Sequence, residues 1–575
     1  MTPNSSPGAP GAPGAPVAPV ASAAPGSPAP SRRRFLASGA VAAVAAAGGV
    51  PLLAACGGSG AGSGSKEGTT TGRALRKILP SYVPSNLVQP DVAGVNGSSP
   101  GFTRLPDPLV RSVPSVPGKG SRFRVMTPLW GTVPKKDNAY YTAVNKAVGA
   151  TLSFDPQDGN TYQDKIGAVL AGSDIPDAMT IPGWNMQGQI RNAITAKFAD
   201  LSPYLAGDAI KKYPNLANIP TGAWQYSVFG GKVRGLPMPS PVLGNAIFYR
   251  KDLTGSGALP ADADELLAFG KEYTAARSKV WAFDDLWTCI QKIFGLLPDA
   301  PHYWRLEGGK LVHKIETPEY REALAFARKL HDGGYVHPDA EANKDADAKI
   351  RFTGGHTVMY NDGTGGWKGM VTEQATANPK FDMRALDFFG HDGGAPVLWQ
   401  DDPASIFTFL SKKLPKARIE ELLAIADYAA APYGTQEFML TNYGVAGTHH
   451  TVEDGVPTFT EQGIQEAQPS TFLFLASPPH TVAFPDEPGL VKEYAGWMAR
   501  QAPHVKKPMF FGMQIVEPQR YASLYTPFDD LQKDIRRGRK KVGDLEAAVT
   551  TWKQSGGDKL RGWYQDILDK DGSGN

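Results

Sequence analysis

The alternation of strand and helix patterns between residues 123 and 181 most constrains the fold of this chain. Short apolar strands are predicted at 123–127, 151–154 and 178–181. Between them, apolar residues recur at helical spacing in 138–148 and in 162–170. This βαβαβ order is typical of an α/β fold with an open, mostly parallel sheet, whose ligands bind beyond the carboxyl ends of the strands.

Two loops that follow these strands carry a tryptophan. Trp130 comes directly after the first strand, and Trp184, followed by Asn185, comes after the third. Because the carboxyl ends of parallel strands share one edge of a sheet, we expect both indole rings to face a ligand site.

A second alternation follows a strong strand at 246–249, and 575 residues are too many for one ordinary domain. We therefore expect a second α/β unit. Helices are predicted at 262–274 and 317–332, with a strand at 357–360. Later in the chain, helices are predicted at 418–431, 545–552 and 560–567.

The N-terminus carries a targeting signal rather than a folded element. Arg32, Arg33 and Arg34 precede an acid-free stretch that ends at Cys56, and the pattern resembles a twin-arginine export signal joined to a lipoprotein box. This resemblance implies a signal peptide over 1–55 and a lipid anchor, palmitate among its acyl chains, on Cys56 at the extracytoplasmic face of the cell membrane. The alternative is an uncleaved membrane anchor.

The charge balance, the cysteine count and the absence of phosphate-binding loops exclude several classes of function. The three arginines are the only charged residues before Cys56, so the 59 basic residues become 56 beyond that point, equal to the 56 acidic ones. A chain without net charge shows no electrostatic footprint for nucleic acid. Two cysteines cannot build a disulfide scaffold. No Walker or Rossmann phosphate loop is present, and we expect no cofactor.

Several segments, taken in order, resemble the extracellular solute-binding lipoproteins of ABC importers, in the large oligosaccharide-binding class that includes alginate-binding relatives. The resemblance runs from about residue 121 to the end, and its segments are 171–177, 198–204, 231–237, 248–253, 352–359, 442–447 and 552–564. It implies a two-lobe periplasmic-binding-protein-like fold of type II, with a ligand cleft between the lobes. It also implies an oligosaccharide ligand, permease subunits as partners, and a monomer.

The domain boundaries follow from the same resemblance, with crossovers expected near Tyr249, Asp401 and Tyr443. The predicted divisions are a signal peptide at 1–55, a flexible tether and extended arm at 56–120, lobe 1 at 121–248 plus 401–442, and lobe 2 at 249–400 plus 443–575. Larger relatives often carry a calcium loop after the first helix of lobe 2. Residues 273–280 lack the alternating acidic oxygens that calcium needs, so we expect no metal.

An oligosaccharide offers hydroxyl groups and flat C–H faces, which aromatic rings and planar polar groups bind. The predicted ligand-binding residues are Trp130, Trp184, Asn185, Trp224, Asn245, Asp362, Trp367, Trp399 and Tyr443. We expect Trp184 and Trp367 to stack on the ligand from opposite lobes, whereas Trp552 lies on an apolar helix face and is predicted to be core. For each tryptophan the alternative is packing in the core, and for Asp362 it is a simple turn.

Two other classes of function stay open at this stage. A surface glycoside hydrolase or polysaccharide lyase would also be anchored and rich in aromatic residues. Its two catalytic carboxylates have no fixed spacing in a sequence, so the sequence neither proves nor excludes them. The zinc motif His-Glu-x-x-His is absent, and no catalytic residue is predicted. A peptide receptor is the second alternative.

Overall fold

The computed structural model describes residues 70–574, apart from 131–132, 160, 187–188 and 342–346. The predicted signal peptide, Cys56 and the start of the tether lie outside these residues. Two large clusters of buried apolar side chains each surround one sheet. We call the unit around the five-stranded sheet lobe 1 and the unit around the four-stranded sheet lobe 2. The α/β class predicted from the sequence is confirmed.

The sheet of lobe 1 has the strand order β3-β2-β4-β15-β7. Strand β2 pairs in parallel with β3 and β4, whereas β15 runs antiparallel to β4 and β7. The strands are β2 (Arg122–Leu129), β3 (Thr151–Asp158), β4 (Ala178–Pro182), β7 (Gly235–Pro239) and β15 (Ala404–Leu410).

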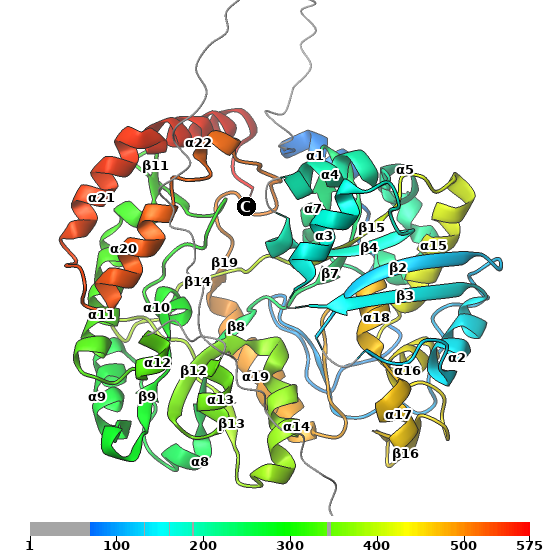
Figure 1. The fold of residues 1–575 in the computed structure, drawn as a ribbon, viewed down its shortest axis with the longest axis horizontal. Helices are drawn as coiled ribbons and strands as arrows, with labels where there is room; N and C mark the ends of the chain where they lie inside the picture. Colours follow the sequence, from blue (N-terminus) through cyan, green and yellow to red (C-terminus); the bar gives the residue numbers. More distant parts are fainter. Residues whose placement is uncertain (1–69, 131–132, 160, 187–188, 342–346, 575) are drawn as a thin grey trace, which may run out of the picture. The chain divides into compact units, whose positions relative to one another are not determined.

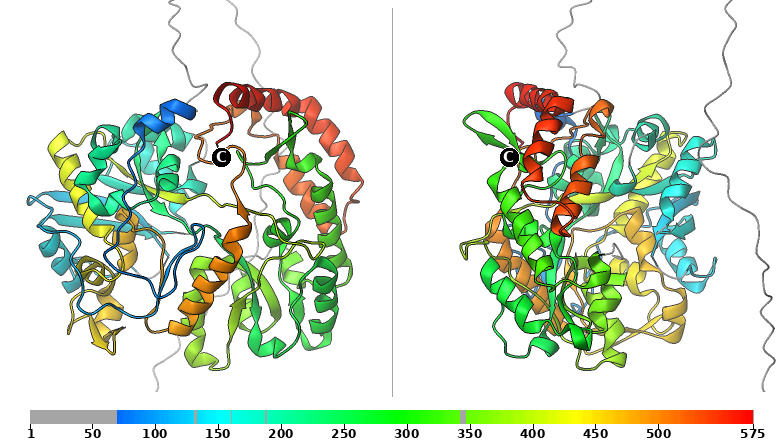
Figure 2. Two further views of the ribbon diagram at one scale, coloured as in Figure 1. Left: turned by 180° about the vertical axis from the view of Figure 1, so that it is seen from behind. Right: turned by 60° about the vertical axis from the view of Figure 1, so that its left-hand side comes forward.

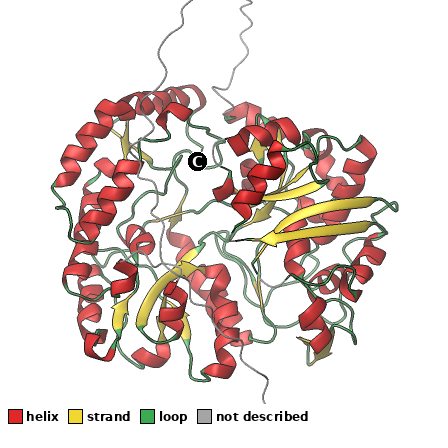
Figure 3. Ribbon diagram, viewed as in Figure 1, coloured by secondary structure: helices red, strands yellow, loops and turns green. Residues whose placement is uncertain are grey.

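Helices cover both sides of this sheet, with α3 and α4 on one side and α2 and α18 on the other (Figures 1 and 3). Helix α2 begins where the sequence predicts, because the Asn138 side chain accepts a hydrogen bond from the Tyr141 N–H at 2.9 Å. The main helices of lobe 1 are α2 (Ala139–Val148), α3 (Tyr162–Ala171), α4 (Gln189–Lys197), α7 (Thr221–Tyr226), α15 (Lys416–Ala429), α16 (Gln436–Tyr443) and α18 (Pro469–Leu475).

The sheet of lobe 2 has the order β13-β8-β12-β9, in which β12 runs antiparallel to β8 and parallel to β9. Its strands are β8 (Asn245–Arg250), β9 (Trp281–Phe283), β12 (Thr357–Gly363) and β13 (Met383–Ala385). The main helices of lobe 2 are α9 (Ala263–Tyr273), α10 (Trp287–Ile293), α11 (Pro318–Asp332), α14 (Trp367–Ala377), α19 (Pro488–Gln501), α20 (Thr526–Arg536), α21 (Asp544–Trp552) and α22 (Asp558–Asp571).

The chain passes between the two buried clusters at three places. The changes fall between Leu236 and Val242, between Leu398 and Ala404, and between Ala476 and Val482. Helix α18 packs on the strands of lobe 1, and the Phe474 carbonyl accepts a hydrogen bond from Thr180 Oγ1 at 3.1 Å. The third change therefore comes later along the chain than the predicted crossover near Tyr443. The lobe boundaries stay a prediction.

Residues 70–120 form an extended arm that contacts both lobes. Helix α1 (Gly72–Ile78) buries Leu75 in the cluster of lobe 1. Farther on, β1 (Gly101–Phe102) pairs with β18 (Val482–Ala483), whose Val482 belongs to the cluster of lobe 2. Figure 2 shows the arm, in blue, on the side turned away from the viewer of Figure 1. Among the described residues, no helix has both the length and the apolar character to cross a bilayer.

Candidate binding cleft

A cavity of about 610 Å³ is lined by residues of both lobes, and we call it the cleft cavity. Pro239 and Ser405 line it from strands β7 and β15 of lobe 1. Asn245 and Thr364 line it from lobe 2, at the start of β8 and just after β12. Because it takes its walls from both lobes, a ligand bound there contacts both at once, which is what stabilises a closed state.

A second cavity of about 440 Å³ lies within lobe 2, and we call it the lobe 2 cavity. Asn361 and Asp362 line it from the end of β12, two residues before Thr364 of the cleft cavity. The Asn361 Oδ1 atom is buried and accepts no hydrogen bond from the described residues. A buried acceptor normally has a partner, so this oxygen is available to a ligand hydroxyl.

Two tryptophan rings lie together at the strand ends of lobe 1. The ring centroids of Trp130 and Trp184 are 6.3 Å apart, and the side chains are 48% and 53% exposed. The edge of Phe474 supports Trp130, with centroids 6.0 Å apart. Gly159 lets the indole approach its backbone closely, because a Cβ there would lie 2.3 Å from the ring. Half-exposed indoles held this way offer apolar faces to a ligand.

The tryptophan pair adjoins the cleft cavity through the turn η2 (Gly183–Asn185). The turn follows β4, whose Pro182 pairs with Ile406 of β15. A Cβ on Gly183 would lie 3.0 Å from the carbonyl oxygen of Ser405, which lines the cleft cavity. The close approach holds the backbone of this turn against Ser405, although neither Trp130 nor Trp184 is itself among the residues that line the cavity.

The three polar candidates take different positions. Asn245 lines the cleft cavity, and Asp362 lines the lobe 2 cavity. The Asp362 Oδ2 atom accepts a hydrogen bond from the Tyr360 hydroxyl at 2.6 Å, which fixes the carboxylate. Asn185 follows Trp184 in the same turn and donates from Nδ2 to Gln163 Oε1 at 2.6 Å. Asn245 and Asp362 are therefore neighbours in the sheet of lobe 2, whereas Asn185 lies in lobe 1.

Two of the predicted aromatic ligands are core residues instead. Trp367 begins α14, and its fully buried ring packs against Phe248 and Tyr494. Trp224 lies on α7 and is buried in the cluster of lobe 1. In both cases the ring lies on a helix that packs it into the core, and it lines neither cavity. The prediction that these two rings line the site is wrong.

Trp399 and Tyr443 do not line either cavity. The half-buried Trp399 donates from Nε1 to the Gly295 carbonyl at 2.9 Å. Tyr443 stacks on Phe459 with centroids 5.4 Å apart, and burial raises the pKa of its hydroxyl to about 12. Both rings therefore make structural contacts in this conformation.

Sequence reasoning missed several polar residues that line the cleft cavity. Among them are His302, Gln400, Asp402 and His480. His302 is buried, and its Nε2 atom lies 3.1 Å from the Tyr226 hydroxyl and 3.4 Å from Asp402 Oδ1. Adjacent acids such as Asp401 and Asp402 usually indicate a solvated surface, and no local pattern marks an isolated histidine as part of a cleft.

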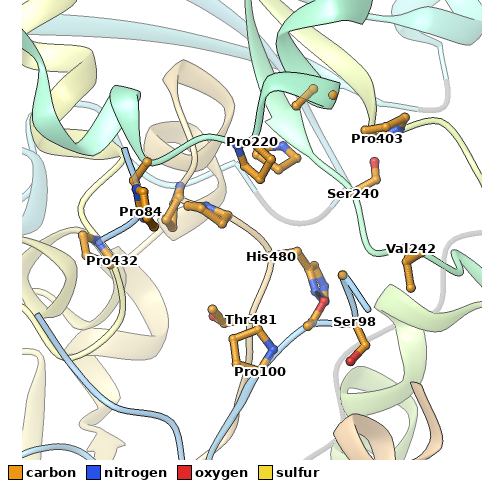
Figure 4. Close-up of a pocket in the computed structure, with 18 of the residues that line it drawn as sticks. Pro84, Ser98, Pro100, Pro220, Ser240, Val242, Pro403, Pro432, His480 and Thr481 are labelled. Atoms are coloured by element: carbon orange, nitrogen blue, oxygen red, sulfur yellow. Dashed lines mark hydrogen bonds between the residues drawn. The ribbon is translucent and has the colours of Figure 1, made fainter. Parts of the chain in front are cut away.

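A third cavity, of about 510 Å³, lies between the arm and the crossover segments (Figure 4). Pro84 and Pro100 of the arm line it, and it shares Ser240 and His480 with the cleft cavity. The His480 Nδ1 atom lies 2.7 Å from Ser99 Oγ, and burial lowers the pKa of its imidazole to about 4. A neutral imidazole therefore stands between the two cavities at neutral pH.

No group of three or more His, Cys, Asp or Glu side chains in the described part of the chain is arranged to hold a metal ion. Residues 273–280, where a calcium loop was considered, contain the end of α9 and the turn η4 (Ala276–Ser278).

Two α/β lobes that line one cavity are the architecture of two-lobe binding proteins. Residues 139–467 match the family described as bacterial extracellular solute-binding protein, and the chain belongs to that family. The family consists of solute-binding proteins rather than enzymes. The expectation of a binding protein, in place of a surface hydrolase or lyase, is thereby confirmed.

Two proteins of Bacillus subtilis strain 168 are similar to this chain. Lipoprotein LipO is 22% identical over 474 residues, which are 78% of this chain and 92% of LipO. The polygalacturonan/rhamnogalacturonan-binding protein YtcQ is 24% identical over 358 residues, which are 60% of this chain and 70% of YtcQ. The resemblance to extracellular solute-binding lipoproteins is in line with both matches.

Solved structures confirm the two-lobe solute-binding fold. An extracellular solute-binding protein from Bifidobacterium longum subsp. infantis has a TM-score of 0.59 at 12% identity, covering 78% of this chain and 98% of that one. The alginate-binding protein AlgQ2, solved without calcium ion, has a TM-score of 0.55 at 14% identity, with the same coverage. At these identities the likeness concerns the fold alone.

Proposed function

We propose that this protein captures an oligosaccharide outside the cytoplasmic membrane and delivers it, unaltered, to the permease of an ABC importer. The observation that carries the proposal is the pair of half-exposed rings, Trp130 and Trp184, beside a cavity that both lobes line. Paired indoles suit the flat C–H faces of sugar rings, and the amide and carboxylate groups of Asn245, Asn361 and Asp362, which line the two cavities, suit hydroxyls.

The names of several matched proteins support the same ligand class. YtcQ is named for polygalacturonan and rhamnogalacturonan, AlgQ2 for alginate, and a third match, from Streptococcus pneumoniae, for N-glycan transport, at a TM-score of 0.54 and 13% identity. We extend to this chain only what they share, which is a glycan ligand. Delivery to a permease follows from the same class.

Isothermal titration calorimetry against a panel of tetrasaccharides tests the proposal, with the processed protein solubilised in detergent. We expect at least one glycan to bind and to be recovered at its original length. Shortened products would favour the hydrolase or lyase. Binding of peptides alone, with no glycan bound, would favour the peptide receptor.

The lipid anchor on Cys56 is part of the proposal. Export through the twin-arginine route and acylation of Cys56 would hold the protein at the membrane. Mass spectrometry of detergent-extracted protein is expected to show a lipidated Cys56 as the first residue. The Cys56→Ser variant is the control, since it cannot be acylated by the same route. A wild-type product that still carries residues 1–55 and stays soluble contradicts this prediction.

A further inference from the structure

The side chains that line the cleft cavity and the lobe 2 cavity are strongly biased toward negative charge. Lys349 is the one lysine or arginine among the described lining residues, and its Nζ atom lies 2.7 Å from Glu373. The acidic lining residues are Asp284, Asp285, Asp299, Asp362, Asp401 and Asp402.

Four cations near the two cavities pair with carboxylates of the cavity walls. Arg351 binds Asp284 through two hydrogen bonds of 2.6 and 2.9 Å. Arg536 lies 2.9 Å from Asp285, and Lys292 lies 3.1 Å from Asp401. Lys314 forms an ion pair with Asp299. Because each positive charge faces a carboxylate of the cavity wall, these cations neutralise the wall and leave no net positive charge for an anionic ligand.

Two of the six carboxylates have no lysine or arginine partner among the described residues. Asp362 accepts hydrogen bonds from the Tyr360 hydroxyl at 2.6 Å and from the Gly363 N–H at 2.7 Å. Asp402 is half exposed, and its ion-pair contact is His302, at 3.4 Å. These carboxylates keep oxygen lone pairs free toward the cavities, as acceptors for hydroxyl or ammonium donors.

A cation elsewhere on lobe 1 does not change this balance. Lys136 lines a different cavity of about 550 Å³, in which Asp137, Asp155 and Asp174 accompany it. Arg124 of that cavity is held by Asp174, at 2.6 Å. Acidic groups therefore outnumber the cations there too.

We infer that the cleft selects glycans that lack carboxylate and sulfate groups, and that Asp362 and Asp402 exclude uronic acids. The inference rests on the proposed function and specifies its substrate class. A sugar hydroxyl donates to a carboxylate, whereas a uronate brings a second negative charge next to it, and the repulsion grows as closure removes water. Alginate and polygalacturonan are uronate polymers, so the names of two matched proteins make a uronate ligand the competing hypothesis.

Matched pairs of glycans test the inference by calorimetry on the processed wild-type protein. The acidic probes are tetragalacturonate, tetramannuronate and tetraguluronate, and each is compared with the neutral glycan made by reducing its C6 carboxylates. Maltotetraose, cellotetraose, xylotetraose and chitotetraose complete the panel. We expect the tightest binder to be neutral and every acidic probe to bind at least a hundredfold more weakly than that binder.

A double variant locates the source of the selectivity. Combining Asp362→Asn with Asp402→Asn is expected to narrow the gap in affinity between neutral and acidic probes at least tenfold. Added NaCl is expected to narrow this gap in the wild type. Asp264→Asn, at an exposed site on α9, is the control and leaves the gap unchanged.

The outcomes separate the inference from the proposed function. A uronate that binds as tightly as its reduced form, or more tightly, overturns the inference and leaves an oligosaccharide-binding protein. If no glycan in the panel binds, the result contradicts both the proposed function and the inference that rests on it. A wild-type preference for neutral glycans that survives unchanged in the double variant overturns the role of the two carboxylates.

Discussion

Replacing Trp367 with alanine is expected to lower the free energy of unfolding of lobe 2 by about 3–5 kcal/mol. The ring is fully buried, and its centroid lies 5.0 Å from that of Phe248 and 5.1 Å from that of Tyr494. Its Nε1 atom donates to the Met383 carbonyl at 3.3 Å. The substitution leaves a cavity between β8, α14 and α19 and removes the donor from a buried carbonyl.

Thermal and urea unfolding of Trp367→Ala measure this loss. Trp184→Ala is the matched control, since its half-exposed ring leaves no closed cavity and is expected to cost less than about 1 kcal/mol. Glycan affinity of the folded fraction should change little in Trp367→Ala. If this variant unfolds like the wild type but loses binding, the ring belongs to the site after all.

The elements with local signals were predictable from the sequence. Helix α2 has the Asn138 cap at its start and Gly149 in a left-handed conformation at its end. Helix α11 begins at Pro318, and the preceding Thr317 caps it, with its hydroxyl accepting a hydrogen bond from the Tyr320 N–H at 3.3 Å. Caps and periodicity act within a few residues, so the sequence carries them directly.

Strands β7 and β15 were not predicted, because their stability comes from partners far away in the chain. Strand β7 contains Pro237 and Pro239, which weaken the strand pattern. In β15, Thr408 is buried, and its Oγ1 atom lies 2.7 Å from Thr180 Oγ1 of β4. The chain returns to this sheet only after it has formed part of the other lobe, so no local sequence pattern identifies β15 as one of its strands.

The same distinction explains which site residues were predicted. Trp130 and Trp184 follow strands of one parallel sheet, and topology alone brings such positions together. Trp367 also follows a strand, but its orientation depends on Tyr494 of α19, which no local pattern connects to it. Strand ends indicate where a site lies, whereas packing decides which of the rings there remain exposed.

Removing either Trp130 or Trp184 is expected to weaken glycan binding at least thirtyfold. Loss of a large aromatic ring that packs on a ligand costs about 2 kcal/mol, which corresponds to roughly thirtyfold in affinity. Trp130 and Trp184 are in contact range of each other, with centroids 6.3 Å apart. The two losses should therefore not add fully, because removal of one ring also loosens the other.

Calorimetry with the tightest-binding tetrasaccharide, on Trp130→Ala, Trp184→Ala and the double variant, measures both effects. Gly159→Ala gives a sharper test, because it keeps both rings while its Cβ, 2.3 Å from the indole, forces Trp130 to move. It should lose part of the affinity that Trp130→Ala loses. Leu306→Ala removes an exposed apolar side chain of lobe 2 that lines neither cavity, and it should bind like the wild type. Normal binding by the double variant would show that the pair does not contact the glycan, since folding does not depend on two half-exposed rings.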